Sequence, residues 1–375
     1  MVNYEIPSVQ DLIRLGEPHP GATTIYLSTA PTPQGRELAF AGAKSAVDEA
    51  IRSLRDAGAS HAEQEALRAQ WTEIAQDSEL WANLSNSLVI MLAPGVSEEY
   101  VLPNQFEPHT QLGDYFDLAP LVRAVTTPQR AFALTLSSNG WNLWTASEGA
   151  RASELPLVGE HAEDAADATN RTSIRGRQLL RRLGGDEGQK VLLDRYAQVV
   201  AEAVRDELGR NDPQGSVPLF VFANEPLLSM VQAHGLPGAV ETVRGAADEL
   251  RPDQIDEAIR QRIGAITAAA VSARADRIGN GFAAGLAVTD LAQLARAAVV
   301  GAVDTLIYDI TVDVRGTLDE VTGALQVADD GTDLLSRLAV QVLRGGGEVI
   351  AVRPGEVEAG IWNGRLLAGL RHPLA

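Results

Sequence analysis

The sequence has no cysteine, which excludes disulfides, thiolate zinc sites and a cysteine nucleophile. Its histidines are few and scattered, with no H-x-x-x-H or comparable ligand spacing: His19, His61, His109, His161, His234 and His372. We therefore expect no metal site, and no motif predicts a cofactor.

Positive charge is also scarce. The chain holds 31 basic against 50 acidic residues, for a formal net charge of −19, and Lys44 and Lys190 are its only lysines. Such a chain repels a phosphate backbone at long range. The composition therefore disfavours DNA as a partner, and any RNA contact must be local.

Long hydrophobic runs are missing as well. The most apolar stretch, "GFAAGLAVTDLAQLARAAVVGAV", is broken by Asp290 and Arg296, so it does not predict a membrane span. The stretch "MVNYEIPSVQDLIRLGE" has no basic start followed by an apolar run, so it does not predict a signal peptide. We expect a cytoplasmic protein with no membrane partner.

What the chain does have is the length and the apolar content for two or three domains, with 375 residues and 45% hydrophobic content. In its first part, "TTIYLSTAP", "SNSLVIMLAPG" and "EYVLPN" predict strands. Helical spacing from about Glu37 to Ala75 predicts two antiparallel helices with "DAGAS" as their turn. These elements make an α/β domain over residues 1–126.

A second α/β domain is expected over residues 127–250. The stretch "RAFALTLSSNGWNLWTAS" predicts a hairpin in which Asn139-Gly140 supplies the positive φ angles of a tight turn. A polar stretch over about 159–176 predicts an exposed loop. A helix from about Asp186 to Leu208, the strand "VPLFVFAN" and the helix "EPLLSMVQAHG" complete the layer.

The third domain, residues 251–375, begins with a linker helix from Pro252 to about Arg277. A helix capped near Thr289 or Asp290 precedes the strand "DTLIYDITVDV", and the helix "GTDLLSRLAVQVLRGGG" precedes the strand "EVIAVRP". The sequence thus predicts an α/β protein of three domains, each a mixed α/β layer.

Residues of this third domain resemble the C-terminal domain of the archaeal and eukaryotic peptide-chain release factor and Pelota superfamily. Val303-Asp304-Thr305-Leu306 matches a strand motif, Gly346-Gly347 a turn, and Leu366–Arg371 a terminal tail, while Asn363-Gly364 replaces the usual paired glycines. The resemblance implies a small release-factor C-terminal-like α/β sandwich.

The first part of the chain resembles the bacterial branch of this superfamily, because "TIYLSTAP" and "ELWANLSNSLVIMLAPG" occupy the places of two motifs of its N-terminal domain. The resemblance implies a ribosome-associated factor acting in ribosome rescue or hibernation, with its middle domain toward the peptidyl-transferase centre. The implied partners are ribosomal RNA and ribosomal proteins, with a translation GTPase as a further candidate.

The stretch "RRLGGDEGQKVLL" resembles the Gly-Gly-Gln tip of the peptide-releasing members. Here Gly184-Gly185 is separated from Gln189 by three residues, two of them carboxylates. Asp186 and Gln189 instead have the spacing of a capping box at a helix start. We therefore expect a helix cap and no catalytic residue. An enzyme, a peptidyl-tRNA hydrolase or RNase-like activity run from this loop, stays the alternative.

An arginine-rich segment, residues 171–182 with the sequence "RTSIRGRQLLRR", comes directly before this stretch and holds five arginines and no acid. Such clusters bind phosphates and stack on bases, but they also pair with surplus carboxylates such as those of "GEHAEDAAD". A non-ribosomal interaction protein that keeps only the fold is thus a further alternative. The candidate RNA-binding residues are Arg171, Arg175, Arg177, Arg181, Arg182, Gly184, Gly185, Gln189 and Lys190.

Overall fold

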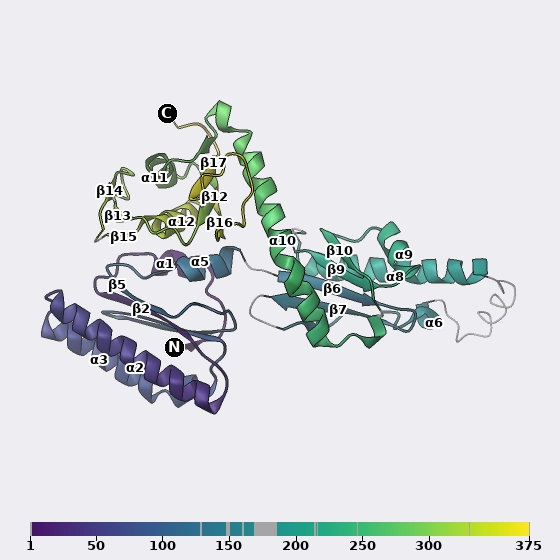
Figure 1. The fold of residues 1–375 in the computed structure, drawn as a ribbon, viewed down its shortest axis with the longest axis horizontal. Helices are drawn as coiled ribbons and strands as arrows, with labels where there is room; N and C mark the ends of the chain where they lie inside the picture. Colours follow the sequence, from purple (N-terminus) through teal and green to yellow (C-terminus); the bar gives the residue numbers. More distant parts are fainter. Residues whose placement is uncertain are drawn as a thin grey trace. The chain divides into compact units, whose positions relative to one another are not determined.

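The computed structural model describes residues 2–127, 130–147, 151–159, 161–168, 186–213, 215, 217–245, 247–329 and 331–374. Its contacts divide the chain into two compact units (Figure 1). Unit 1 combines Met1–Pro128 with Thr267–Ala375, and unit 2 is Gln129–Ile266. The mixed sheets and helices of both units confirm the α/β class.

The first part of unit 1 is built on a five-stranded sheet of order β1-β4-β3-β2-β5. Its strands are β1 (Val2–Asn3), β2 (Ala22–Ser28), β3 (Ser87–Ala93), β4 (Val96–Leu102) and β5 (His109–Gly113). The pairings are antiparallel except for β1, which runs parallel to β4. The three strands predicted from sequence are confirmed.

Two long helices cover one face of this sheet, α2 (Pro33–Asp56) and α3 (His61–Gln76), followed by the short α4 (Ser78–Ala82) (Figure 1). Each long helix starts at a hydroxyl cap, since Thr32 accepts from the Gly35 N–H and Ser60 forms a capping box with Glu63. The predicted helical hairpin is therefore confirmed, with residues 57–60 as its turn.

Strand β3 is buried on both faces, and its successive side chains point alternately into two different apolar cores. Leu88, Ile90 and Leu92 pack in the cluster that includes α2 and α3. Val89 and Met91 face the opposite cluster, which also contains residues of the C-terminal part of unit 1.

The C-terminal part of unit 1 has a four-stranded sheet of order β11-β17-β12-β16. Its elements are β11 (Ala287–Val288), α11 (Leu291–Val299), β12 (Val303–Asp309), α12 (Leu334–Arg344), β16 (Glu348–Val352) and β17 (Leu366–Leu370), with the 3₁₀ helix η2 (Phe282–Ala284) before them. The predicted cap is Asp290, whose carboxylate accepts from the Gln293 N–H at 3.0 Å. The two predicted helix–strand pairs are present.

A second, small sheet of order β14-β13-β15 was not predicted. It consists of β13 (Arg315–Leu318), β14 (Leu325–Val327) and β15 (Thr332–Asp333). The predicted strand "DTLIYDITVDV" is correspondingly too long, because β12 ends at Asp309. There the Asp309 carboxylate accepts from the backbone N–H and the hydroxyl of Thr311, which closes a turn.

Helices α1 (Val9–Leu15) and α5 (Ala119–Thr126) join the two parts of unit 1, because both contact α12. Leu12 and Leu15 of α1 lie in one apolar cluster with Leu335 and Leu338 of α12. The first and last segments of the chain therefore share a core. The division into domains 1–126, 127–250 and 251–375 stays a prediction about folding units.

Unit 2 holds a five-stranded sheet of order β10-β9-β6-β7-β8. Its strands are β6 (Arg130–Leu136), β7 (Trp141–Ser147), β8 (Ser153–Glu154), β9 (Leu219–Ala223) and β10 (Val240–Val243). The predicted hairpin is β6–β7, with Leu136 opposite Trp141. The predicted tight turn is wrong, because four residues connect the strands and Gly140 does not take a positive φ.

Helices α8 (Asp186–Asn211), α9 (Leu227–Ala233) and α6 (Ala165–Ala168) pack on one face of this sheet, and η1 (Ala247–Glu249) follows β10. Helix α6 lies within the stretch predicted to be a loop. On the other face, Ile255, Ile259 and Ile263 of α10 (Pro252–Gly279) pack against β6 and β9, as their spacing predicts. The later α10 residues Val271 and Ala275 pack in unit 1. None of the described helices is long and apolar enough to cross a membrane.

Candidate nucleic-acid interface

Helix α8 begins at Asp186, as the sequence predicted, so that Gln189 and Lys190 lie within it and the other candidate residues precede it. Gln189 and Lys190 are exposed, and Val191 is 61% exposed. Burial begins with Tyr196, which packs on the sheet of unit 2. Figure 1 shows α8 continuing past the edge of this sheet. Gln189, Lys190 and Val191 therefore present their side chains to solvent, whereas Leu193 already packs against the core of unit 2.

The structure places two of the candidate residues and leaves the others untested. Gln189 and Lys190 are neighbours in the first turns of α8. The remaining candidates lie outside the described residues: Arg171, Arg175, Arg177, Arg181, Arg182, Gly184 and Gly185. The predicted capping box also lies outside them, because the side chain of Asp186 is not described.

Polar contacts hold the later turns of α8 against the loop that follows α9. Arg205 donates to the carbonyls of His234 and Gly235 at 2.6 and 2.8 Å, and Asp194 lies 3.0 Å from the His234 ring. These contacts fix the loop after α9 against α8. The anchored side chains are thereby separate from the exposed start of the helix.

Glu207 is a buried acid of α8, with 2% of its surface exposed. Burial acts to raise its pKa, but hydrogen bonds from Arg210, the Val158 N–H and Asn211 together lower the pKa below its ordinary value. The carboxylate is fully partnered, and we assign it to stability rather than to chemistry.

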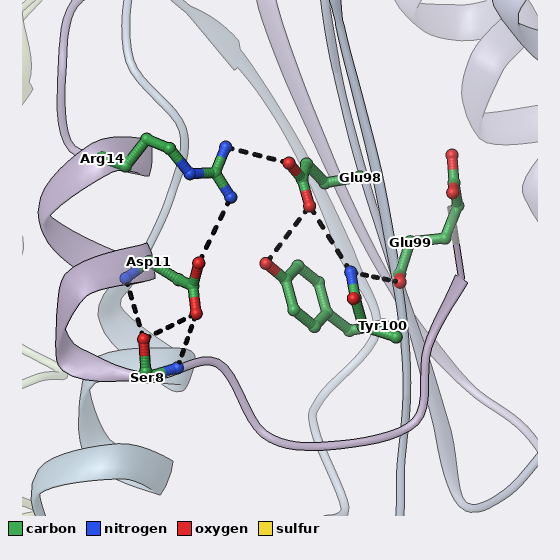
Figure 2. Close-up of polar contacts among 7 residues, drawn as sticks. Ser8, Asp11, Arg14, Glu98, Glu99 and Tyr100 are labelled. Atoms are coloured by element: carbon green, nitrogen blue, oxygen red, sulfur yellow. Dashed lines mark hydrogen bonds and ion pairs between the residues drawn. The ribbon is translucent and has the colours of Figure 1, made fainter.

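A charged network in unit 1 also has a structural explanation (Figure 2). Ser8 caps α1 by accepting from the Asp11 N–H, and in return the Asp11 carboxylate accepts hydrogen bonds from Ser8 that lower its pKa. Arg14 lies 3.5 Å from Asp11 and 2.9 Å from Glu98, which also accepts from the Tyr100 hydroxyl at 3.4 Å. The network ties α1 to β4.

One cavity of about 190 Å³ lies in unit 1 between the end of β5 and α12, with Tyr115, Asp117, Asp333 and Arg337 in its wall. Burial raises the pKa of Asp333 to about 6. Asp117 lies 2.6 Å from a ring nitrogen of His109, and this contact raises the pKa of the imidazole. Among the described residues no group of three His, Asp or Glu side chains could hold a metal ion.

The α/β layers and the sequence motifs define a release-factor-like protein. Residues 128–269 match the family model described as bacterial archaeo-eukaryotic release factor family 11. These residues include the whole of unit 2, and over them the chain is similar to the bacterial branch of the archaeo-eukaryotic release factor superfamily. The family resemblance read from the sequence is thereby confirmed.

Several solved structures are similar to the chain at low identity. Archaeal Pelota, from a model of ribosome-bound Pelota and ABCE1, is 16% identical over 72% of this chain and 74% of that chain, with a TM-score of 0.43. Dom34 of S. cerevisiae, a translation termination-like factor, is 11% identical over 80% and 78%, with a TM-score of 0.35. The archaeal termination factor aRF1 is 14% identical over 97% and 98%, with a TM-score of 0.25.

These TM-scores are too low for the likeness to carry an argument about function. No curated protein sequence matches the chain significantly.

Proposed function

We propose that this protein is a ribosome-associated relative of release factors that acts in ribosome rescue or hibernation and has no peptide-release catalysis of its own. The observation that supports this is the family match over residues 128–269, which spans the arginine-rich segment and α8. Ribosomal RNA and ribosomal proteins are the proposed partners, with a translation GTPase as a further one. The proposed location is the cytoplasm.

The order of charges along the sequence of unit 2 supports RNA contact at one local surface. The arginine-rich segment carries five positive charges and leads into the exposed start of α8, where Lys190 adds another. Because the whole chain has a net charge of −19, contact has to depend on such a concentration of cations. Arginine suits it, since its guanidinium binds phosphate in a bidentate manner.

The absence of catalysis is supported by the position of Gln189. In the peptide-releasing proteins that this stretch resembles, a glutamine lies directly beside two glycines, whose freedom lets the backbone approach the ester closely. Here Gly184-Gly185 precedes α8, whereas Gln189 lies in its first turn. Gln189 therefore lies inside a helix and is not the direct neighbour of the two glycines.

The proposal is tested by sedimenting the purified full chain with 70S ribosomes over a series of salt concentrations. We expect co-sedimentation at low salt and a steep loss as salt rises, because phosphate contacts release counterions while the global charge opposes binding. Failure to sediment with ribosomes even at low salt would remove the proposal. That result would favour the alternative hypothesis of a non-ribosomal interaction protein.

A further inference from the structure

The outer surface of the α2–α3 hairpin has a groove with a volume of about 600 Å³. Four cations line it, Lys44, Arg52 and Arg55 from α2 and Arg68 from α3, against one acid, Asp48. We call the surface that these four cations line the basic groove. In a chain with 50 acidic and 31 basic residues, such a local excess of positive charge needs an explanation.

The spacing along α2 places its three cations on one exposed stripe. Lys44, Arg52 and Arg55 are all exposed, while Val47, Ala50 and Ile51 between them are buried against the sheet. A helix rises ~1.5 Å per residue, so the stripe from Lys44 to Arg55 is roughly 16 Å long. Neighbouring phosphates of one duplex strand are roughly 3.4 Å apart along the axis. The stripe is therefore long enough to lie along several phosphates of a nucleic-acid backbone.

The cations make mostly solvent-exposed contacts within the protein, among them an ion pair of Arg68 with Glu65 in which both side chains are about half exposed. Among the described residues, Lys44 has no ion pair, and the Arg52 Nε donates to the Asp48 backbone carbonyl at 3.2 Å rather than to a carboxylate. Arg55 lies 3.4 Å from Asp56 with both side chains more than 60% exposed. Exposed pairs of this kind contribute little to stability, so the cations are free to exchange their partners.

From this placement we propose that the basic groove is a second RNA-binding surface, in unit 1, which contacts the phosphate backbone of ribosomal RNA. The apolar part of its lining is limited to small or buried residues, Ala41 and Ile51, so it offers no pocket for the side chains of a peptide. Four cations in a row match a polyanion of regular charge spacing. The inference rests on the proposed function and adds the N-terminal helices to the contact.

The test compares two double charge reversals in the full chain, Lys44→Glu with Arg52→Glu in the groove and Arg353→Glu with Arg365→Glu as the control. All four residues are exposed in unit 1, so both variants change net charge equally and differ only in position. We expect the groove variant to bind 70S ribosomes at least tenfold more weakly and the control to stay within about twofold. Equal urea midpoints for both variants show that the fold is intact.

A milder variant, Lys44→Ala with Arg52→Ala, should lower the slope of log affinity against log salt by roughly two, one for each lost phosphate contact. The same variants are titrated against protein-free ribosomal RNA. Loss of ribosome binding without loss of RNA binding would mean that the groove contacts a ribosomal protein, which overturns the inference.

The two proposals fail separately. If the wild-type chain sediments with ribosomes and the groove variant does so equally well, the groove inference is wrong and the proposed function stands. If the wild-type chain does not sediment but binds protein-free RNA through the groove, the proposed function is wrong and the groove stands. If the wild-type chain binds neither ribosomes nor RNA, both are wrong.

Discussion

At the scale of single residues, one arginine joins the first and last segments of the chain within unit 1. Arg123 of α5 is 6% exposed and forms two hydrogen bonds with Glu356, at 2.8 and 2.9 Å. It also donates to the Ala351 carbonyl of β16 at 2.8 Å. Its charge is therefore buried with three acceptors around it.

Arg123→Met should lower the free energy of unfolding by about 2–3 kcal/mol, because it leaves the Ala351 carbonyl without this donor and the Glu356 carboxylate with only the Arg353 N–H. Urea unfolding followed by circular dichroism measures this. Arg251→Met, at an ion pair whose arginine is 71% exposed, is the matched control and should leave the free energy of unfolding almost unchanged. Equal effects of the two substitutions would contradict a structural role for Arg123.

A second single-residue prediction concerns Gln189. If Gln189 only stabilises the start of α8, Gln189→Ala should lower the free energy of unfolding by on the order of 1 kcal/mol and leave ribosome binding unchanged. The assay is release of peptide from peptidyl-tRNA by the purified protein. Release activity that disappears in this variant would overturn the assignment of no catalysis and favour the hydrolase alternative.

At the scale of elements, the start of α12 couples stability to pH. The Asp333 carboxylate caps α12 by accepting from the N–H groups of Leu335 and Ser336 at 3.0 and 3.3 Å. Burial raises the pKa of Asp333 to about 6, and the nearby Asp117 carboxylate adds to the effect. An unfolded aspartate ionises near pH 4. The folded state therefore holds this proton between about pH 4 and pH 6.

Because the folded pKa is raised, this group contributes stability that is present below about pH 4 and lost as pH rises through 6. Asp333→Asn keeps a cap acceptor and removes the titration. Between pH 4 and pH 7 the wild type should lose up to about 2 kcal/mol relative to this variant. Urea unfolding at the two pH values measures the difference, and parallel curves for the two proteins would contradict it.

The arginine-rich segment is the other element with a testable contribution. Changing Arg175, Arg177, Arg181 and Arg182 to Ala should lower ribosome affinity at least tenfold and flatten its salt dependence. The melting temperature should hardly move, because exposed ion pairs contribute about 0–1 kcal/mol each.

The matched control changes four exposed arginines of unit 1, Arg277, Arg296, Arg353 and Arg365, to Ala and removes the same charge. If instead the segment variant binds normally and melts much earlier, its arginines are partners of the acidic surface.

At the scale of the whole molecule, the distribution of cores predicts which fragments fold. Unit 2 closes both faces of its sheet with its own residues, from α8 and α9 on one side and the first half of α10 on the other. The first part of unit 1 does not, because Tyr26, Val89 and Met91 pack in a cluster shared with the C-terminal part.

Residues 130–266 alone should therefore unfold in one cooperative urea transition, whereas residues 2–127 alone should expose apolar surface and lack one. Joining 2–127 to 267–375 through a flexible Gly/Ser linker should restore a cooperative transition. A stable, cooperative 2–127 fragment would support the independent N-terminal domain predicted from the sequence.

The sequence by itself determined the elements whose signal is local. Helical spacing on both sides of the stretch "DAGAS" predicts α2 and α3, a cap near Asp290 predicts the start of α11, and the apolar spacing of Ile255, Ile259 and Ile263 identifies the buried stripe of α10. Each signal is complete within a few turns of chain, because caps and helical periodicity act between neighbours. The family resemblance likewise depended on short motifs.

Only the tertiary structure decided what depends on residues far apart. The small β14-β13-β15 sheet escaped prediction because its strands have two to four residues each and are stabilised by pairing rather than by their own pattern. The basic groove escaped it because Arg68 joins Lys44 and Arg52 only when α3 folds back along α2. The shared core of unit 1 needs residues such as Leu12 and Leu338 to meet across almost the whole chain, and no local pattern encodes such a contact.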